Sequence, residues 1–231
     1  MTSTDTASGK AGQVAVVTGG SRGIGQAISL ELAARGSTVV VNYTDNAAAA
    51  EEAVAAISAA GGSAIAVQAD VADEDAVAAL FDRAEAEFGG VDIVVNSAGR
   101  LALSTIADLD LNVLDEIHRV NIRGTFVVAK QAARRLRDGG SFVSFSTSVV
   151  GAQFPTYGAY AASKGAVEAV TLILARELRG RDITVNTVSP GPTATAMFLD
   201  GKPRNRSPRW PRPRRSNAWA RRRTSPAWSP S

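Results

Sequence analysis

The sequence predicts an α/β protein built on a doubly wound parallel sheet, with helices on both faces of the sheet. Two observations carry this prediction. Short apolar runs that suit buried strands alternate along the chain with longer segments in which apolar residues recur at helical spacing. Polar and glycine-rich residues directly follow those short runs, at positions that a parallel sheet brings to one edge. Ligands of such sheets bind at that edge.

Six strands are expected, and each is a short apolar run of about five residues. They lie at residues 14–18, 38–42, 64–68, 91–95, 141–145 and 183–188. A helix is expected after each of the first five strands. These helices lie between Ile28 and Gly36, at residues 47–60, at 73–88 with an acid-rich first turn, at 111–137, and at 157–179.

Composition limits the class of protein. With 231 residues and 45% hydrophobic content, the chain can bury a sizeable core, and one domain over residues 13–202 is the simplest organisation. The absence of cysteine excludes disulfides and thiolate zinc sites, and no metal site is expected. Residues 1–12 lack an apolar leader segment, and no later run approaches the roughly 18 apolar residues of a membrane span. We therefore expect a disordered start, a cytoplasmic location and no membrane partner.

The net charge of +3 conceals two regions of opposite sign. Residues 203–231 hold nine arginines and no acid, which leaves 16 basic against 22 acidic side chains in the rest of the chain. The body is therefore acidic, and this argues against nucleic acid as its partner.

The first strand is followed by a glycine-rich turn that opens a helix. The turn reads Thr18-Gly19-Gly20-Ser21-Arg22-Gly23-Ile24-Gly25. Glycines let the backbone approach a pyrophosphate closely, and the helix N-terminus offers free amides and partial positive charge. The alternative is a merely tight turn, but the position between strand and helix favours a dinucleotide site.

Tyr160 and Lys164 lie four residues apart, which places both on one face of the helix over residues 157–179. A phenol titrates near ~10 and an ammonium near ~10.4, so neither is an obvious catalyst alone. A cation beside the phenol lowers its pKa by roughly a unit or more, and Tyr160 then becomes a plausible proton donor. The alternative is an ordinary surface pair.

Polar turns follow four of the other strands. They are Asp70-Val71, Asn96-Ser97-Ala98-Gly99, Ser146-Thr147-Ser148 and Pro190-Gly191. Each alone suits an ordinary turn. Their convergence with the glycine-rich turn on one edge of the sheet favours a common binding site.

Residues 13–202 resemble the short-chain dehydrogenase/reductase family, in the branch of 3-oxoacyl-[acyl-carrier-protein] reductases and related carbonyl reductases. The resemblance rests on these motifs together with Asn121 in Val120-Asn121-Ile122 and with Thr195. The resemblance implies a Rossmann fold and hydride transfer between NADP(H) and a ketone, a 3-oxoacyl carbonyl or a secondary alcohol. It implies that Tyr160 is the general acid and base and that Lys164 lowers its pKa and binds the nicotinamide ribose. Asn121 would hold a water that links Lys164 to solvent.

The resemblance also implies that a serine polarises the carbonyl. The position of that hydroxyl is Ser148 when it is counted back from Gly151, and Thr147 when it is counted forward from the end of the strand. The spacing between Ser148 and Gly151 matches the family and favours Ser148. In the family Asp70 contacts the adenine, Asn96 and Gly99 line the cofactor, and Thr195 holds the carboxamide. The full implied cofactor set is Gly19, Ser21, Arg22, Gly23, Ile24, Gly25, Asn42, Asp70, Val71, Asn96, Ala98, Gly99, Tyr160, Lys164, Pro190, Gly191 and Thr195.

The end of the second strand indicates which cofactor is used. A carboxylate there holds a ribose 2′-hydroxyl, whereas a 2′-phosphate needs a cation. Val41-Asn42-Tyr43-Thr44 holds no carboxylate, Arg22 lies in the glycine-rich turn, and Asp45 lies a few residues further on. These residues favour NADP(H) over NAD(H).

Residues 203–231 differ abruptly from the body, with all three Trp and six of the nine Pro. One interpretation is a basic arm that binds nucleic acid. The favoured interpretation is a shifted reading frame, which makes the tail disordered and non-native. Codons that encode residues 216–230 can be chosen so that, read one base out of frame, they encode Leu-Glu-Arg-Leu-Gly-Thr-Pro-Glu-Asp-Ile-Ala-Gly-Val-Val-Ser. This second peptide resembles the family's C-terminal stretch. On that interpretation the last helix and strand are missing and the sixth strand is an open edge. The family's homodimer would then be expected, its tetramer would be doubtful, and a catalytically inactive NADP-binding protein is the alternative function.

Overall fold

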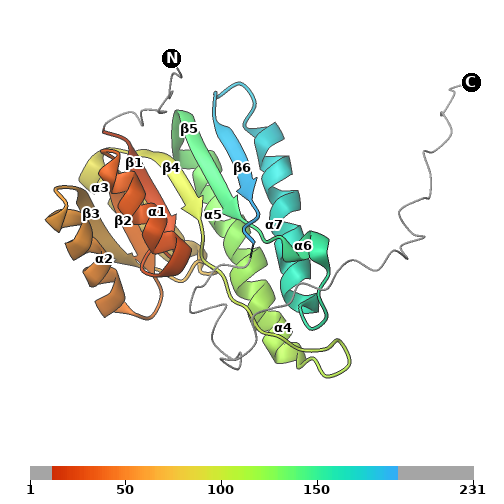
Figure 1. Ribbon diagram of the computed structural model, residues 1–231. Coiled ribbons are helices and arrows are strands. Elements are labelled where there is room, and N and C mark those ends of the chain that lie inside the picture. The colour runs from red at the N-terminus through yellow and green to blue at the C-terminus, as the bar shows by residue number, and fades with distance from the viewer. Residues whose placement is uncertain (1–11, 192–231) are drawn as a thin grey trace, which may run out of the picture. The chain divides into compact units, whose positions relative to one another are not determined.

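The computed structural model describes residues 12–191, which form a six-stranded parallel sheet (Figure 1). The strand order is β3-β2-β1-β4-β5-β6. The strands are β1 (Val14–Thr18), β2 (Thr38–Tyr43), β3 (Ser63–Gln68), β4 (Val91–Asn96), β5 (Leu136–Phe145) and β6 (Thr184–Val188). The predicted doubly wound parallel sheet is confirmed. Thr195 and the predicted tail lie outside the described residues.

Helices connect the strands and lie on both faces of the sheet (Figure 1). They are α1 (Gly23–Ala34), α2 (Ala47–Ala59), α3 (Glu74–Phe88), α4 (Leu111–His118), a π-helical turn η1 (Arg119–Arg123), α5 (Gly124–Arg135), α6 (Val149–Ala152) and α7 (Gly158–Glu177). Because the chain moves outward from β1 to β3 and then crosses back to β4, α1 and α2 cover one face, and α3, α5 and α7 cover the other.

The core divides into two layers that follow the alternation of side chains along each strand. Val17, Val39 and Val41 pack with α1 and α2 through Ala33, Ala53 and Ile57. Val16, Val40 and Val94 point to the opposite face, where they form one cluster with side chains of α3, α5 and α7. The strands therefore read as continuous apolar runs because both of their faces are buried.

One expected helix contains a π-helical turn and ends two residues early. The prediction of a helix over residues 111–137 is confirmed from Leu111 to Arg135, where the helical backbone runs through the π-helical turn η1, and it is wrong for the last two residues. Leu136 already has extended backbone dihedrals and pairs with Val91 of β4, so β5 begins five residues before the expected start at 141. Burial of the Leu136 side chain is the tertiary contact that outweighs helical periodicity here.

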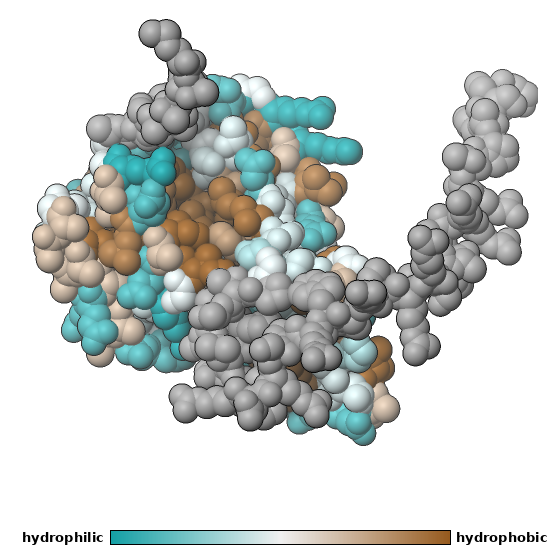
Figure 2. Space-filling view, viewed as in Figure 1, coloured by the Kyte–Doolittle hydropathy of each residue, from teal (hydrophilic) through white to brown (hydrophobic). Residues whose placement is uncertain are grey.

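The face that carries α1 and α2 is only partly covered within residues 12–191. These two helices pack on β1, β2 and β3, while Ile93, Val143 and Phe145 of β4 and β5 are only partly buried. Figure 2 shows apolar residues gathered near the centre of this view. At the side of the sheet, β6 pairs only with β5 among the described strands, and Val188 is exposed.

Candidate active site

The turns after β1 and β4 pack directly against each other. The Thr18 hydroxyl accepts hydrogen bonds from the backbone amides of Ser97 and Ala98, both at 3.1 Å. Gly19 has a φ of 62°, and a Cβ on it would lie 3.0 Å from the Cα of Ala98. A side chain at position 19 would therefore strain the backbone and separate the two turns.

Helix α1 begins at this turn without a capping side chain. Arg22 is its N-cap in extended conformation, no side chain caps the first amides, and the first turn holds no acidic residue. Gly25 is buried, and a Cβ there would collide with the carbonyl oxygen of Gly19. The helix N-terminus is thus drawn close to the turn and presents backbone amides suited to an anion. This bare cradle and its donors fit the pyrophosphate of a dinucleotide.

Of the other predicted residues in this turn, Ser21 is buried, whereas Gly23 and Ile24 are at least partly exposed. The Arg22 side chain is exposed, and within residues 12–191 no hydrogen bond or ion pair holds it. It is therefore free to meet a charged ligand at the surface.

Asn42 lies beneath the turn and is turned inward. Its side chain is 1% exposed; the amide donates to the carbonyl of Ala69 at 2.9 Å, and the side-chain oxygen accepts from the amide of Gly19 at 3.3 Å. Asn42 therefore ties together the ends of β1, β2 and β3. The exposed residues after β2 begin with Thr44 and Asp45.

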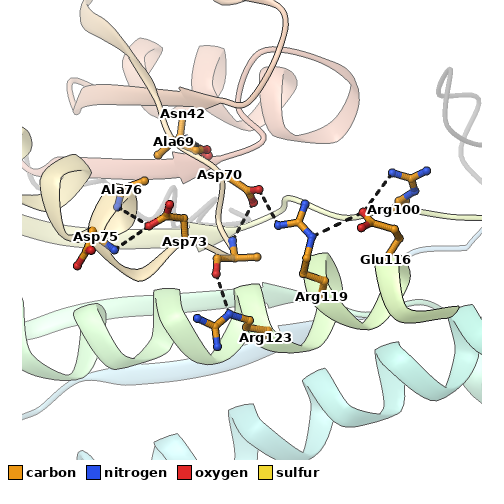
Figure 3. A network of polar contacts seen from close by, with 11 residues as sticks. Asn42, Ala69, Asp70, Asp73, Asp75, Ala76, Arg100, Glu116, Arg119 and Arg123 are labelled. Atoms are coloured by element: carbon orange, nitrogen blue, oxygen red, sulfur yellow. Dashed lines mark hydrogen bonds and ion pairs between the residues drawn. The ribbon is translucent and has the colours of Figure 1, made fainter. Parts of the chain in front are cut away.

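The turn after β3 carries Asp70 and Val71. Asp70 accepts a hydrogen bond from the Ala72 amide at 2.9 Å and pairs with Arg119 at 2.7 Å, as Figure 3 shows. Partial burial raises the pKa of the Asp70 carboxyl, but the Ala72 and Arg119 bonds outweigh it, and the pKa lies below its usual value. Val71 is buried.

Two buried asparagines hold the next layer of the site. Asn96 donates to the hydroxyls of Thr125 at 2.9 Å and Ser144 at 3.3 Å. Asn121, in η1, donates to the Ser163 hydroxyl at 2.9 Å, and the Arg100 amide donates to its side-chain oxygen at 2.7 Å. Asn121 thereby joins the turn after β4 to helix α7.

Lys164 is buried at the same place. Its ammonium donates to the carbonyl of Phe145 at 2.6 Å, and burial lowers the pKa of Lys164 from 10.5 to about 8. A Cβ on Gly99 would lie 3.5 Å from the Lys164 nitrogen and 3.4 Å from the Asn121 side-chain oxygen. The structure thus brings Gly99, Asn121 and Lys164 together, with Ala98 beside Gly19.

Tyr160 is four residues from Lys164 on α7, and its ring centroid lies 6.0 Å from the Lys164 nitrogen. Burial raises the pKa of the Tyr160 phenol above its usual 10.0, and a hydrogen bond with Thr147 opposes that rise. The expectation that Lys164 lowers the pKa of Tyr160 is therefore not met in this structure. The physical reason is that burial dominates, while the ammonium is engaged with Phe145.

The two candidate hydroxyls after β5 differ in their surroundings. Thr147 is buried and hydrogen-bonded to Tyr160. Ser148 is partly exposed and is the N-cap of α6, but its hydroxyl makes no capping bond; its amide donates to the carbonyl of Pro190 at 3.0 Å. Pro190 and Gly191 therefore lie beside the turn after β5.

Sequence reasoning missed one residue of this network. The Ser163 hydroxyl donates to the carbonyl of Tyr160 at 2.7 Å and accepts from Asn121, so it fixes α7 relative to η1. Its place directly before Lys164 was the available signal. Among residues 12–191 no cluster of three or more potential metal ligands is present.

A glycine-rich cradle, a buried lysine and a half-buried tyrosine at one edge of a doubly wound sheet define a dinucleotide-binding oxidoreductase. Comparison with known proteins agrees. The family model described as enoyl-(acyl carrier protein) reductase matches residues 11–226. The chain belongs to the short-chain dehydrogenase/reductase family, whose members are oxidoreductases.

Individual relatives cover most of the chain. A short-chain type dehydrogenase/reductase of Picea abies is 47% identical over 83% of this chain and 74% of its own length. NADPH-dependent aldehyde reductase 2, chloroplastic, of Arabidopsis thaliana is 48% identical over 83% of this chain and 76% of its own. A crystal structure of a short chain dehydrogenase from Burkholderia cenocepacia in complex with NADP has a TM-score of 0.78 at 45% identity, covering 81% of this chain and 77% of that one.

Two expectations stay predictions. No helix among residues 12–191 is long and apolar enough to cross a membrane. The Arabidopsis relative is named as chloroplastic, so the cytoplasmic location is not confirmed. The homodimer also remains a prediction.

Proposed function

We propose that this chain is an NADPH-dependent carbonyl reductase that acts on an aldehyde, a ketone or a 3-oxoacyl group and runs the alcohol oxidation in reverse. The observation that carries the proposal is the meeting of Tyr160, Lys164 and Asn121 at the sheet edge that also holds the glycine-rich turn. The relatives described as NADPH-dependent and the neighbour in complex with NADP support the choice of cofactor.

The residues that would hold the cofactor are those at the carboxyl ends of the strands. The amides at the start of α1 would bind the pyrophosphate, Arg22 would meet the 2′-phosphate, and Asp70 would meet the adenine. When bound, NADPH supplies the hydride that reduces the carbonyl carbon. Asn42, being turned inward, would support the site by shaping the turn that contacts the cofactor.

Tyr160 would supply the proton. Because burial keeps the pKa of Tyr160 above its usual value, the phenol is fully protonated at neutral pH and has a proton to donate to the developing alkoxide. The partly exposed hydroxyl of Ser148 would polarise the carbonyl, while Thr147 orients the phenol. Asn121 and Ser163 fix the helix that carries Tyr160.

The test is NADPH oxidation by the full chain over a panel of aldehydes, ketones and 3-oxoacyl thioesters, with the variant Tyr160→Phe. We expect turnover by the wild type and a loss of about 10²–10⁴-fold in kcat for the variant, with NADPH affinity retained, because general acid catalysis contributes that factor. NADPH binding without turnover over the whole panel would favour the inactive NADP-binding protein instead. Failure of the wild type to bind NADPH would reject the proposal.

A further inference from the structure

The loop after β3 is fastened to η1 by two hydrogen bonds, which Figure 3 shows, and to the start of α5 by a packing contact. Arg119 donates to the Asp70 carboxylate at 2.7 Å, and Arg123 donates to the Ala72 carbonyl at 2.8 Å. Between them Val71 packs so closely on Gly124 that a Cβ there would lie 2.8 Å from a Val71 methyl. The loop therefore has a fixed position relative to η1.

Within this contact, Arg119 fixes the direction of the carboxylate. One Asp70 oxygen accepts from the Ala72 amide and the other from Arg119, so both rotation and translation of the group are restricted. The side chain of Asp70 is still 31% exposed. A carboxylate has about four acceptor positions, and two hydrogen bonds leave acceptor capacity for a donor from solvent or from a ligand.

The strand order places Asp70 at one end of the candidate site. The glycine-rich turn follows the central strand β1, Tyr160 and Lys164 lie on α7 on the β5 side, and Asp70 follows β3 on the opposite side. A dinucleotide with its pyrophosphate at α1 and its reactive ring near Tyr160 has its second base on the Asp70 side. The exocyclic amine of adenine is the donor that suits a fixed carboxylate.

We propose that Arg119 is a positioning residue for the adenine of the cofactor, acting through Asp70 and not by touching the cofactor itself. The inference rests on the proposed function. Because Asn121 belongs to the same π-helical turn, η1 positions both the carboxylate at the adenine end and the asparagine beside Lys164. Glu116 lies 3.6 Å from Arg119 and 3.7 Å from Arg100 and helps to orient the guanidinium.

The test measures dissociation constants of NADPH and of its deamino analogue, in which hypoxanthine replaces adenine, by nucleotide fluorescence titration of the full chain. Hypoxanthine presents a carbonyl where adenine presents the amine, so a fixed carboxylate disfavours it. For Arg119→Ala we expect NADPH to bind about tenfold more weakly. We also expect the ratio of the deamino-NADPH to the NADPH dissociation constant to fall toward one, because a freed carboxylate no longer distinguishes the bases.

Two further variants separate positioning from general damage. Arg119→Lys keeps the positive charge and should recover part of both effects. Arg135→Ala removes the ion pairs of a partly buried arginine with Asp82 and Glu85, which join α5 to α3 away from Asp70, and it should leave both constants unchanged. Circular dichroism at matched protein concentration checks that each variant is folded.

The outcomes are distinct. A weaker NADPH affinity together with a reduced discrimination between the two nucleotides supports the inference. An NADPH affinity of Arg119→Ala within about twofold of wild type overturns it, and so does an equal loss for both nucleotides, which would be structural damage. If wild type binds neither nucleotide, the proposed function fails and this inference fails with it.

Discussion

Thr147, buried at the end of β5, is hydrogen-bonded to the phenol of Tyr160. The hydroxyl bonded to the proton donor is therefore that of Thr147, whereas Ser148 is partly exposed and makes no capping bond at α6. Two adjacent hydroxyls thus have different surroundings. This difference separates a role in orienting the phenol from a role in polarising a carbonyl.

The first prediction compares Thr147→Val with Ser148→Ala. The Thr147 bond holds the pKa of Tyr160 below the value that burial alone would give, so its removal should raise that pKa further. Carbonyl reduction needs the protonated phenol, so kcat should fall as the pH rises through the pKa of Tyr160. This fall, the basic limb of the kcat profile, should therefore move to higher pH in Thr147→Val. Ser148→Ala should lower kcat by about 10²-fold or more without moving that limb.

The measurement is kcat against pH for both variants and wild type, with NADPH saturating. An unmoved basic limb in Thr147→Val would show that its hydroxyl does not interact with the phenol during turnover. Unchanged kcat in Ser148→Ala would assign the polarising role elsewhere.

The second prediction concerns the stability cost of burying Lys164. Burial lowers its pKa from 10.5 to about 8. Below pH 8 the lysine is charged in both the folded and the unfolded chain, and the folded state bears the full cost of desolvation. Between about pH 8 and 10.5 only the unfolded chain holds the proton, so stability should rise with pH over that window.

Lys164→Met removes this charge. Relative to wild type, the variant without cofactor should be more stable below pH 8, by at most roughly 3–4 kcal/mol before the lost bond to Phe145 is subtracted. The difference should shrink as pH rises to about 10.5, and reductase activity should be lost. Urea unfolding at several pH values measures it, and a difference that grows with pH would contradict the assignment.

The strands and the motifs at their ends were accessible from sequence because they depend on local patterns. Buried strands read as apolar runs, and the glycine-rich turn must lie between β1 and α1. The contacts that orient the side chains were not accessible. Arg119 meets Asp70 across 49 residues, and Asn42 reaches Ala69 across 27. The π-helical turn was missed because its interruption of the helix serves a tertiary contact of Asn121 that periodicity does not encode.

The third prediction separates Asn42 from Arg22, two residues assigned to the cofactor from sequence. Asn42 is buried and its amide satisfies backbone groups of three strand ends, so Asn42→Ala should destabilise the chain by about 1–3 kcal/mol through unsatisfied buried groups. It should weaken NADPH and NADH binding alike. Arg22 is exposed, and Arg22→Ala should leave stability unchanged.

Arg22→Ala should instead reduce the preference for NADPH over NADH by about tenfold, because the lost contact is a charge-assisted bond to the 2′-phosphate that NADH lacks. The measurement is the dissociation constant of each nucleotide, together with urea unfolding without nucleotide. Arg83→Ala, which removes an exposed arginine paired with Glu87 on α3, is the matched control and should change neither quantity. A changed nucleotide preference in Asn42→Ala would show that the buried amide senses the 2′-phosphate. An unchanged preference in Arg22→Ala would show that Arg22 does not contact that phosphate.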